Sequence, residues 1–316
     1  MAERSRTSSG RPGEPPGHTQ HTGWVLITAA ASGIGLACAQ LLDQLGFGVF
    51  AGMRDMAKAT VLQQQSSAKL TPILLDVTSP YLIARAVQYM AGVLAQEGTG
   101  LIGVVNTATN EHHGPLELLP LDFIRQEIEV DYLGSLAVIK ACLPLLRQSR
   151  GRIVNFSSVT GRCVFRGIGA SCAAKYAVEA MSDALRLELA PWGMHVTVIE
   201  PGATDTPLWD KVQHTFEELP QHVSLEQLQL YYPSWPEAVQ QALADKEAFA
   251  QVMLPAARMA QAVLHALTSQ RPKTRYLVVR WDDRALIMLK RLLPDKWFDR
   301  LAMLKFRDQP SAVTGP

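Results

Sequence analysis

Short apolar runs alternate with longer amphipathic segments along most of the chain from Trp24 onward. The short runs are apolar on both faces, as expected for strands of a parallel sheet that helices cover on both sides. These runs are Trp24–Thr28, Gly48–Gly52, Thr71–Leu75, Leu101–Asn106, Gly151–Ser157, His195–Glu200 and Arg275–Val279. The segments between them carry apolar residues at three- and four-residue spacing, which predicts helices. The predicted helices are Gly35–Leu45, Pro80–Gln96, Leu121–Arg147, Ala174–Leu189 and Pro255–Leu267.

Three regions break this alternation. Residues 208–252 are rich in Gln, Glu and aromatic side chains and have little strand character, which predicts a helical insertion. Residues 283–316 place apolar side chains at helical spacing between Lys and Arg, which predicts an amphipathic C-terminal extension. Residues 1–22 repeat Pro, Gly, Ser and His without an apolar run, which is typical of a disordered tail. We therefore expect one α/β domain over residues 23–282, with a doubly wound parallel sheet that carries the insertion.

Charge and cysteine content exclude some classes of function. Lys and Arg total 30 against 29 Asp and Glu, so the chain as a whole creates no field that would attract nucleic acid. Cys38, Cys142, Cys163 and Cys172 have neither the spacing nor the histidine neighbours of a zinc site, so we expect packed, reduced thiols and no metal. No apolar run approaches the ~18 residues that span a bilayer. These features predict a cytoplasmic protein whose partner is a small molecule.

A glycine-rich segment joins the first predicted strand to the first predicted helix. It reads TAAASGIG, from Thr28 to Gly35. Gly33 and Gly35 allow the backbone to come close to a ligand, and the N-terminus of the following helix carries a partial positive charge. The segment therefore predicts a site for the pyrophosphate of a dinucleotide, although an ordinary tight turn is the alternative interpretation.

This segment resembles the loop of the short-chain dehydrogenase/reductase family, which reads T-G-x-x-x-G-x-G, with Ala29 in place of the first glycine. Other landmarks of that family follow in order along the chain. They are Asp76 in LLDVT, Asn106 in VVNTAT, Pro201 with Gly202, and Thr206. The resemblance runs from about Trp24 to Val279 and implies a Rossmann-type fold and an NAD(P)-dependent oxidoreductase.

The resemblance also implies a set of residues around the cofactor. Asp76 and Val77 would flank the adenine, while Asn106 would brace the sheet. Thr206 would reach the nicotinamide carboxamide. The complete set is Thr28, Ser32, Gly33, Ile34, Gly35, Arg54, Asp76, Val77, Asn106, Lys175, Pro201, Gly202 and Thr206.

The end of the second predicted strand bears on the choice of cofactor. It reads GMRD, and the guanidinium of Arg54 can bind the 2′-phosphate of NADP. Ser32 can add a hydroxyl to the same phosphate. We therefore expect NADP, with NAD as the alternative that the neighbouring Asp55 favours.

The family resemblance also implies a catalytic set, and this chain departs from it. Lys175 matches the family lysine and Ser158 matches its serine, but Ser171 stands where the family has a tyrosine. Asp131 replaces the family's asparagine on the long helix before Ser158. Tyr176 cannot substitute, because five residues further along a helix it points about 140° away from position 171. We expect any catalysis to depend on Ser158, Ser171, Lys175 and Asp131.

These replacements leave the reaction open. A serine hydroxyl is a far weaker acid than a phenol and is shorter by a ring, so Ser171 is a poor proton shuttle. A carboxylate at Asp131 would pair with Lys175 and cancel the charge that tunes the acid. Thr107 and Thr109 add bulk near the expected nucleotide.

Three functions are compatible with these residues. The first is a dehydrogenase or reductase of a lipophilic alcohol or ketone, since the chain is similar to steroid and retinol dehydrogenases. The second is a catalytically inactive nucleotide-binding protein with a sensing or partner-binding role. The third is a non-redox enzyme in which Asp131, Ser171 and Lys175 perform acid–base chemistry. Whether the protein is an enzyme is thus undecided by the sequence.

We expect a lipophilic substrate to bind beneath the insertion and the C-terminal extension. Candidate wall residues, which ordinary core packing explains equally well, are Trp209, Phe216, Leu228, Tyr231, Tyr232 and Trp235. Residues 283–306 would cover the substrate, lie on a membrane surface, or simply pack on the domain. The resemblance also implies a homodimer or homotetramer built on the helices Leu121–Arg147 and Ala174–Leu189.

Overall fold

The computed structural model describes residues 23–305, so the predicted tail and residues 306–316 lie outside the described part. Its centre is a seven-stranded parallel sheet in the order β3-β2-β1-β4-β5-β6-β9. The strands are β1 (Trp24–Ile27), β2 (Gly48–Met53), β3 (Leu70–Leu74), β4 (Leu101–Asn106), β5 (Arg152–Phe156), β6 (His195–Pro201) and β9 (Arg275–Val278). The prediction of a doubly wound parallel sheet is confirmed, and each predicted strand is present to within one or two residues at its ends.

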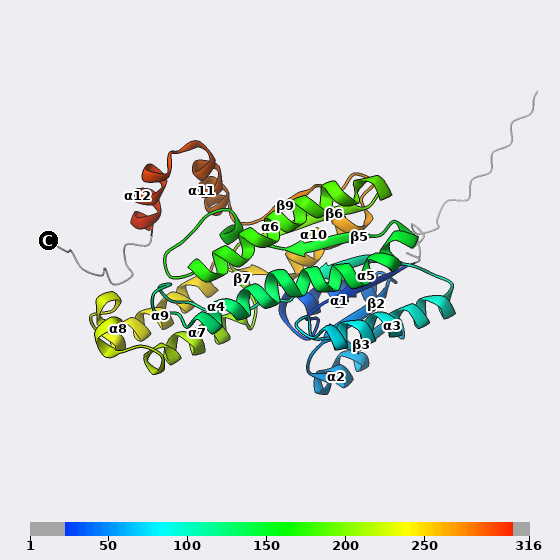
Figure 1. Ribbon diagram of the computed structural model, residues 1–316, viewed down its shortest axis with the longest axis horizontal. Helices are drawn as coiled ribbons and strands as arrows, with labels where there is room; N and C mark the ends of the chain where they lie inside the picture. Colours follow the sequence, from blue (N-terminus) through cyan, green and yellow to red (C-terminus); the bar gives the residue numbers. More distant parts are fainter. Residues whose placement is uncertain (1–22, 306–316) are drawn as a thin grey trace, which may run out of the picture.

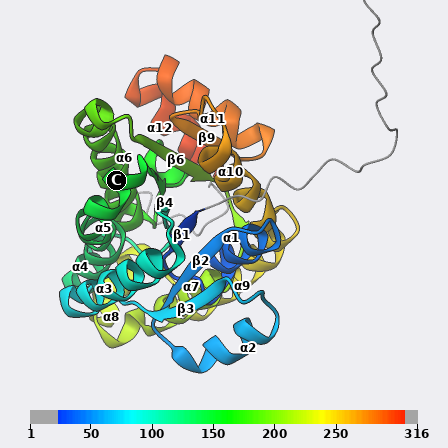
Figure 2. The ribbon, with the colours of Figure 1, turned by 90° about the vertical axis from the view of Figure 1, so that its right-hand side faces the viewer.

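Helices cover both faces of the sheet, as Figure 2 shows from its end. One face carries α3 (Pro80–Glu97), α5 (Ser135–Ser149) and α6 (Gly169–Leu189), and the other carries α1 (Gly33–Gln44) and α10 (Ala256–Thr268). Short helices connect the strands elsewhere. They are η1 (Met56–Lys58), α2 (Ala59–Gln64), η3 (Val159–Gly161) and η4 (Ala190–Trp192).

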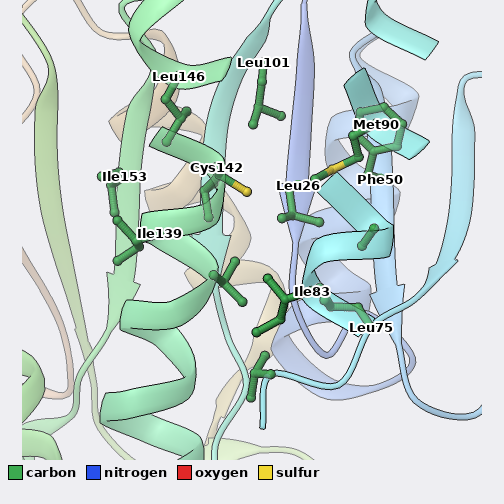
Figure 3. Close-up of a cluster of buried hydrophobic side chains, with 14 of the residues drawn as sticks. Leu26, Phe50, Leu75, Ile83, Met90, Leu101, Ile139, Cys142, Leu146 and Ile153 are labelled. Carbon is green, nitrogen blue, oxygen red and sulfur yellow. The ribbon is translucent and has the colours of Figure 1, made fainter. Parts of the chain in front are cut away.

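The strand side chains alternate between the two helical layers. Leu26 and Phe50 join the cluster against α3 and α5 (Figure 3), whereas their neighbours Ile27 and Val49 join the cluster against α1 and α10. Trp24 stacks on Phe50 with ring centroids 4.4 Å apart. Because both faces of the sheet are buried, every strand could be recognised as an uninterrupted apolar run.

The long helix predicted over Leu121–Arg147 contains an irregular segment. It consists of α4 (Leu121–Glu127), a π-helical stretch η2 (Ile128–Gly134) and then α5. Such π-helical turns change the direction of side chains and are frequent at functional sites. In this protein the π-helical stretch carries Asp131, whose side chain is completely buried.

The insertion forms helices at one end of the molecule, next to the carboxyl ends of the strands (Figure 1). They are α7 (Leu208–Glu218), η5 (Leu219–Gln221), α8 (Leu225–Tyr231) and α9 (Trp235–Ala250). A two-stranded sheet of β7 (Thr204–Asp205) and β8 (Leu254–Pro255) closes its base, and this sheet was not predicted. Two paired residues per strand are too few to leave an alternation pattern in the sequence.

The C-terminal extension forms α11 (Trp281–Leu292) and α12 (Asp295–Lys305), which lie beside α6 (Figure 1). Leu286, Ile287 and Phe298 are buried in one cluster with Cys163, so one side of the extension packs on the domain. None of the described helices is long and apolar enough to cross a membrane.

Candidate functional site

The loop between β1 and α1 has the backbone conformation that close contact with a ligand requires. Ala29 and Gly33 both have positive φ angles, 51° and 54°. A Cβ atom on Gly35 would come within 2.5 Å of the Ala29 carbonyl oxygen and 2.8 Å of Thr107 Oγ1. Ser32, the N-cap residue of α1, makes no side-chain capping hydrogen bond. The first N–H groups of α1 are therefore not satisfied by a side-chain cap, as expected where a phosphate binds.

Buried hydrogen bonds connect this loop to β4 and its following turn. Thr28 Oγ1 accepts from Thr107 N at 3.0 Å and from Ala108 N at 3.1 Å. Asn106 Nδ2 donates to Asn155 Oδ1 at 2.9 Å and so bridges β4 and β5. The predicted cofactor residues Thr28 and Asn106 thus hold the loops in place from inside the sheet.

The remaining predicted nucleotide contacts lie along the same edge of the sheet, outside the cavity described below. Asp76 Oδ1 accepts from Thr78 N at 2.9 Å, which turns the chain after β3. Val77 is buried against Gly134. Arg54 is exposed after β2, and Asp55 caps the short helix η1 by accepting from Ala57 N at 2.9 Å. The carboxylate of Asp55 therefore has a structural role that its sequence position alone did not indicate.

A cavity of about 490 Å³ lies at the carboxyl ends of the strands, between the domain and the insertion. It brings together predicted catalytic and cofactor residues from four separate parts of the chain. Those that line it are Ile34, Ser158, Ser171, Lys175, Pro201, Gly202 and Thr206. Most of the cavity lining is apolar, as is usual for a small-molecule site.

Lys175, which lines this cavity, forms a buried ion pair with Asp131. Lys175 Nζ lies 2.8 Å from Asp131 Oδ2, and the two side chains are 9% and 0% exposed. Thr109 Oγ1 contacts both groups, at 3.1 Å from the ammonium and 3.0 Å from the carboxylate. Asn110 N donates to the other oxygen of Asp131 at 2.8 Å. The ammonium is therefore held by a carboxylate, as the sequence analysis expected.

Ser158 and Ser171 are both placed on the cavity wall, but their surroundings differ. Ser158 caps η3, accepts from Thr160 N at 3.2 Å and lies 3.5 Å from the Pro201 carbonyl oxygen. Ser171 is 2% exposed and lies in the first turn of α6, which begins at Gly169, five residues before the predicted helix start. Tyr176 is 40% exposed and is not among the described residues that line the cavity. This agrees with the expectation that Tyr176 does not replace the missing tyrosine.

The cavity also contains an ion pair that the sequence analysis missed. His113 and Glu111, in the loop after β4, both line it, and His113 Nε2 lies 2.9 Å from Glu111 Oε1. Burial raises the pKa of Glu111, but the hydrogen bond from His113 and the charges of His113, Lys175 and His112 outweigh burial and lower the pKa below its ordinary value. The signal in the sequence was the run NEHHG directly after a parallel strand, where side chains reach the ligand-binding edge.

A second, fully buried pair anchors the same loop. Glu127 Oε1 accepts from His112 N at 2.7 Å and lies 3.0 Å from His112 Nδ1, and the His112 ring stacks on Phe123. Burial raises the pKa of Glu127, since its side chain has no access to solvent. The Glu127–His112 pair anchors the loop that follows β4 at the residue directly before His113.

Of the six candidate wall residues, three line the cavity and three do not. Trp209, Phe216 and Tyr232 line it. The prediction was wrong for Leu228, Tyr231 and Trp235, which belong instead to the hydrophobic cluster inside the insertion. Helical spacing does not distinguish a side chain facing the cavity from one facing the neighbouring helices of the insertion.

The cysteines take no part in this site. All four are free and buried, and burial raises the pKa of Cys38 and of Cys142 to about 12. Thiolates, the reactive form, are therefore scarce at neutral pH. Among the side chains that the structure describes, no cluster of His, Cys, Asp and Glu has the arrangement of a metal site.

Comparison with known proteins gives consistent results. A family model described as short chain dehydrogenase matches residues 23–217. The chain is 32% identical over 286 residues to retinol dehydrogenase 5 of Mus musculus, covering 87% of this chain and 86% of that protein. It is 34% identical over 297 residues to 17-beta-hydroxysteroid dehydrogenase type 6 of Bos taurus, covering 92% and 90%. A crystal structure of a short-chain dehydrogenase from Streptomyces avermitilis superposes with a TM-score of 0.65 at 25% identity, covering 90% of this chain and 97% of that one.

Proposed function

Because the chain belongs to the short-chain dehydrogenase/reductase family, whose oxidoreductases use NAD(P), we propose that it is an NADP-dependent oxidoreductase of a lipophilic alcohol or ketone. The observation that carries the proposal is the cavity, in which Ser158 and Lys175 face the aromatic side chains of the insertion. Apolar walls with a few polar groups on one side suit a bulky, mostly apolar substrate with one oxygen function. The names of two relatives point to a retinoid or a steroid as the substrate class.

The residues present fit a dinucleotide. The absence of a side chain at Gly35 lets the loop pack closely on the start of α1, whose N–H groups would bind the pyrophosphate, and the exposed Arg54 would bind the 2′-phosphate. Asp76 and Val77 would hold the adenine, and Thr206 the nicotinamide carboxamide. When bound, the nicotinamide supplies or accepts the hydride.

The chain's own groups orient the substrate. Ser158 can donate a hydrogen bond to the substrate oxygen. Its present hydrogen bond to the Pro201 carbonyl oxygen is long, at 3.5 Å, so a hydrogen bond to the substrate can replace it. Lys175 provides positive charge near the same oxygen, reduced by its pairing with Asp131. The walls contributed by Trp209, Phe216 and Tyr232 exclude water from the reacting atoms.

A second function has one specific observation in its favour. Ser171 lacks the phenol that the family uses for proton transfer. The carboxylate of Asp131 neutralises the positive charge of Lys175, which the family uses to tune that phenol. An inactive NADP-binding protein, with a sensing or partner-binding role, would retain the loop at Gly35 and need neither group.

The test is a titration of the purified protein with NADPH and NADH, followed by assays with retinal, estrone and a medium-chain methyl ketone. We expect NADPH to bind more tightly than NADH and at least one of these carbonyl compounds to be reduced. Tight NADPH binding without turnover of any of the three would favour the inactive protein. Failure to bind either nucleotide would exclude both functions.

The C-terminal extension is a second element whose role we propose here. Its outer side exposes Trp281, Leu292, Trp297 and Met303, next to several Lys and Arg residues. Such a side is suited to the surface of an anionic membrane, to which a helix can bind without crossing it. Co-sedimentation with vesicles containing anionic lipid, compared with Trp281→Ser/Trp297→Ser, tests this role; equal sedimentation would refute it.

We also propose a homodimer or homotetramer built on α4, η2, α5 and α6. These helices expose large apolar side chains, including Leu121, Leu133 and Leu187. Light scattering coupled to size-exclusion chromatography measures the mass in solution, and a monomer at micromolar concentration would contradict the proposal.

A further inference from the structure

The imidazole–carboxylate pair His113–Glu111 occupies the same cavity as Ser158, Ser171 and Lys175. The His113 side chain is 24% exposed and that of Glu111 is 21% exposed, and both residues line the cavity. A pair that faces a cavity with one ring nitrogen bonded to a carboxylate is chemically able to move protons.

Backbone contacts place this pair next to the position of the missing tyrosine. Gly114 N donates to the Gly167 carbonyl oxygen at 2.7 Å, which ties the loop after β4 to the segment that enters α6. A Cβ atom on Gly169 would lie 2.9 Å from Leu116 Cγ, so the two segments pack without a gap. Ser171 follows Gly169 by two residues, and its small side chain leaves space in the cavity that a phenol would fill.

The orientation of the His113 ring is fixed from two sides. Glu111 Oε1 lies 2.9 Å from Nε2, and the Trp209 ring of α7 lies edge-on at a centroid distance of 6.2 Å and an angle of 84°. Since the pKa of Glu111 is lowered, its carboxylate is ionised at neutral pH and accepts the Nε2 proton. The ring nitrogen that this carboxylate does not bind is Nδ1, which leaves Nδ1 as the atom able to exchange a proton with a ligand in the inference below.

We propose that His113, oriented by Glu111, is the proton donor and acceptor that replaces the family's tyrosine. The inference rests on the proposed oxidoreductase function. His113 is the catalytic residue, because it would contact the substrate oxygen, and Glu111 is a positioning residue.

The proton balance of the step is simple. In reduction, a bound nicotinamide would supply the hydride for the new C–H bond at the carbonyl carbon and be oxidised in turn, and the C=O π pair would pass to the oxygen. That oxygen takes the proton from Nδ1 of the doubly protonated His113 ring, and the Nδ1–H bond breaks. Neutral His113 then regains a proton from solvent, and oxidation of an alcohol follows the same path in reverse.

Other ionisable groups face His113, and a pH profile reports all of them together. They are Glu111 and His112 from its own loop, Arg166 and Lys175 from the segment before α6 and from α6, and Arg280, Asp282 and Asp283 from the start of α11. Comparing the pH profile of the wild type with that of His113→Gln isolates the contribution of His113.

The test uses the full chain, NADPH as cofactor and retinal, estrone and a medium-chain methyl ketone as probes. His113→Gln should lower kcat by about 100-fold or more and remove one limb of the pH profile, because general acid–base groups contribute factors of this size. Glu111→Gln should lower kcat by about tenfold, while NADPH affinity stays within twofold in both variants. The matched control is His214→Gln, because His214 also pairs with a glutamate, Glu218 at 3.4 Å, but is 73% exposed outside the cavity.

A second readout needs no cofactor. In ¹⁵N-histidine spectra, the resonances that are missing from the His113→Gln variant belong to His113. Above neutral pH these resonances should show the tautomer with the proton on Nε2, and Glu111→Gln should shift them toward a mixture of the two tautomers. An Nδ1–H tautomer, or a His113→Gln variant within threefold of wild-type kcat, overturns this inference while leaving the proposed oxidoreductase intact. A wild type that binds NADPH but reduces no probe overturns the proposed function, and with it the role of His113.

Discussion

The two sides of the cavity depart from the family pattern to very different degrees. The nucleotide side, formed by the β1–α1 loop and the ends of β3 and β4, differs by the methyl group of Ala29 and by the added bulk of Thr107 and Thr109. The proton-transfer side, formed by η2, the loop after β4 and the start of α6, has Asp131 for asparagine and Ser171 for tyrosine. It also carries the pair His113–Glu111.

The difference follows from how each side acts. Phosphate is bound by backbone N–H groups and a helix N-terminus, so side-chain changes are tolerated as long as the loop keeps its shape. Proton transfer depends on one titratable atom at one place, so replacing the phenol of the family by a serine hydroxyl removes the function unless another group supplies it. The variants described next test whether the nucleotide side binds NADPH and whether the proton-transfer side depends on its own residues in place of the family's tyrosine.

The largest effect is expected from breaking the buried ion pair. Asp131→Ala leaves the Lys175 ammonium without its carboxylate and removes an acceptor of Thr109 and Asn110. We expect the free energy of unfolding to fall by about 3–5 kcal/mol, measured by urea denaturation. Asp131→Asn, which restores the family's residue and most of its hydrogen bonds, should cost less than Asp131→Ala; equal costs would show that the charge is irrelevant.

The nucleotide side should be most sensitive at Gly35. In Gly35→Ala the new Cβ would lie 2.5 Å from the Ala29 carbonyl oxygen, so the loop must move. We expect NADPH affinity to fall about 30-fold, equivalent to ~2 kcal/mol, by isothermal titration calorimetry. The control Gly92→Ala, on α3 with open space around it, should leave the affinity unchanged. Unchanged binding in Gly35→Ala would mean that the nucleotide does not use this loop.

Arg54 should decide between the two cofactors. Its exposed side chain has no carboxylate partner among the described residues, and Asp55 is engaged in capping η1. Arg54→Ala should weaken NADPH binding about tenfold and leave NADH binding unchanged, since only NADPH carries the 2′-phosphate. Arg85→Ala, another exposed arginine, serves as the charge control. Equal weakening by Arg54→Ala and Arg85→Ala would refute a specific contact.

The smallest effect is expected at Ala29. A non-glycine residue at φ 51° is strained, and Ala29→Gly removes that strain without altering a buried contact. We expect the free energy of unfolding to rise by about 1 kcal/mol, with NADPH affinity unchanged or improved. A loss of stability would show that the methyl group of Ala29 makes a favourable contact.

Much of the fold could be predicted because its strands are buried on both faces and its helices are long. Parts that depend on a few residues could not. The β7–β8 pair and the π-helical turns around Asp131 leave no periodic signal. The pairing of Asp131 with Lys175 could be expected from the charges at two positions of the family pattern, but the contacts of this pair with Thr109 and Asn110 could not.

His113 and Glu111 were missed for a physical reason. They lie in an irregular loop, and only the fold brings them to the cavity that Ser171 also lines. On the helix of position 171 itself, the sequence offers only Tyr176 as an alternative phenol. Residues close in space but about sixty positions apart in the chain cannot be found by spacing alone.

The most direct test of the account is a single-turnover experiment with NADPH that carries deuterium at both nicotinamide C4 positions. Wild-type protein in excess over labelled NADPH is mixed with retinal or estrone, and the alcohol is analysed by mass spectrometry. If the nucleotide side binds NADPH and His113 transfers the proton, deuterium appears on the carbinol carbon, and the rate at which it appears falls sharply in His113→Gln. Bound NADPH without any deuterium transfer to retinal or estrone would contradict the account and identify an inactive nucleotide-binding protein.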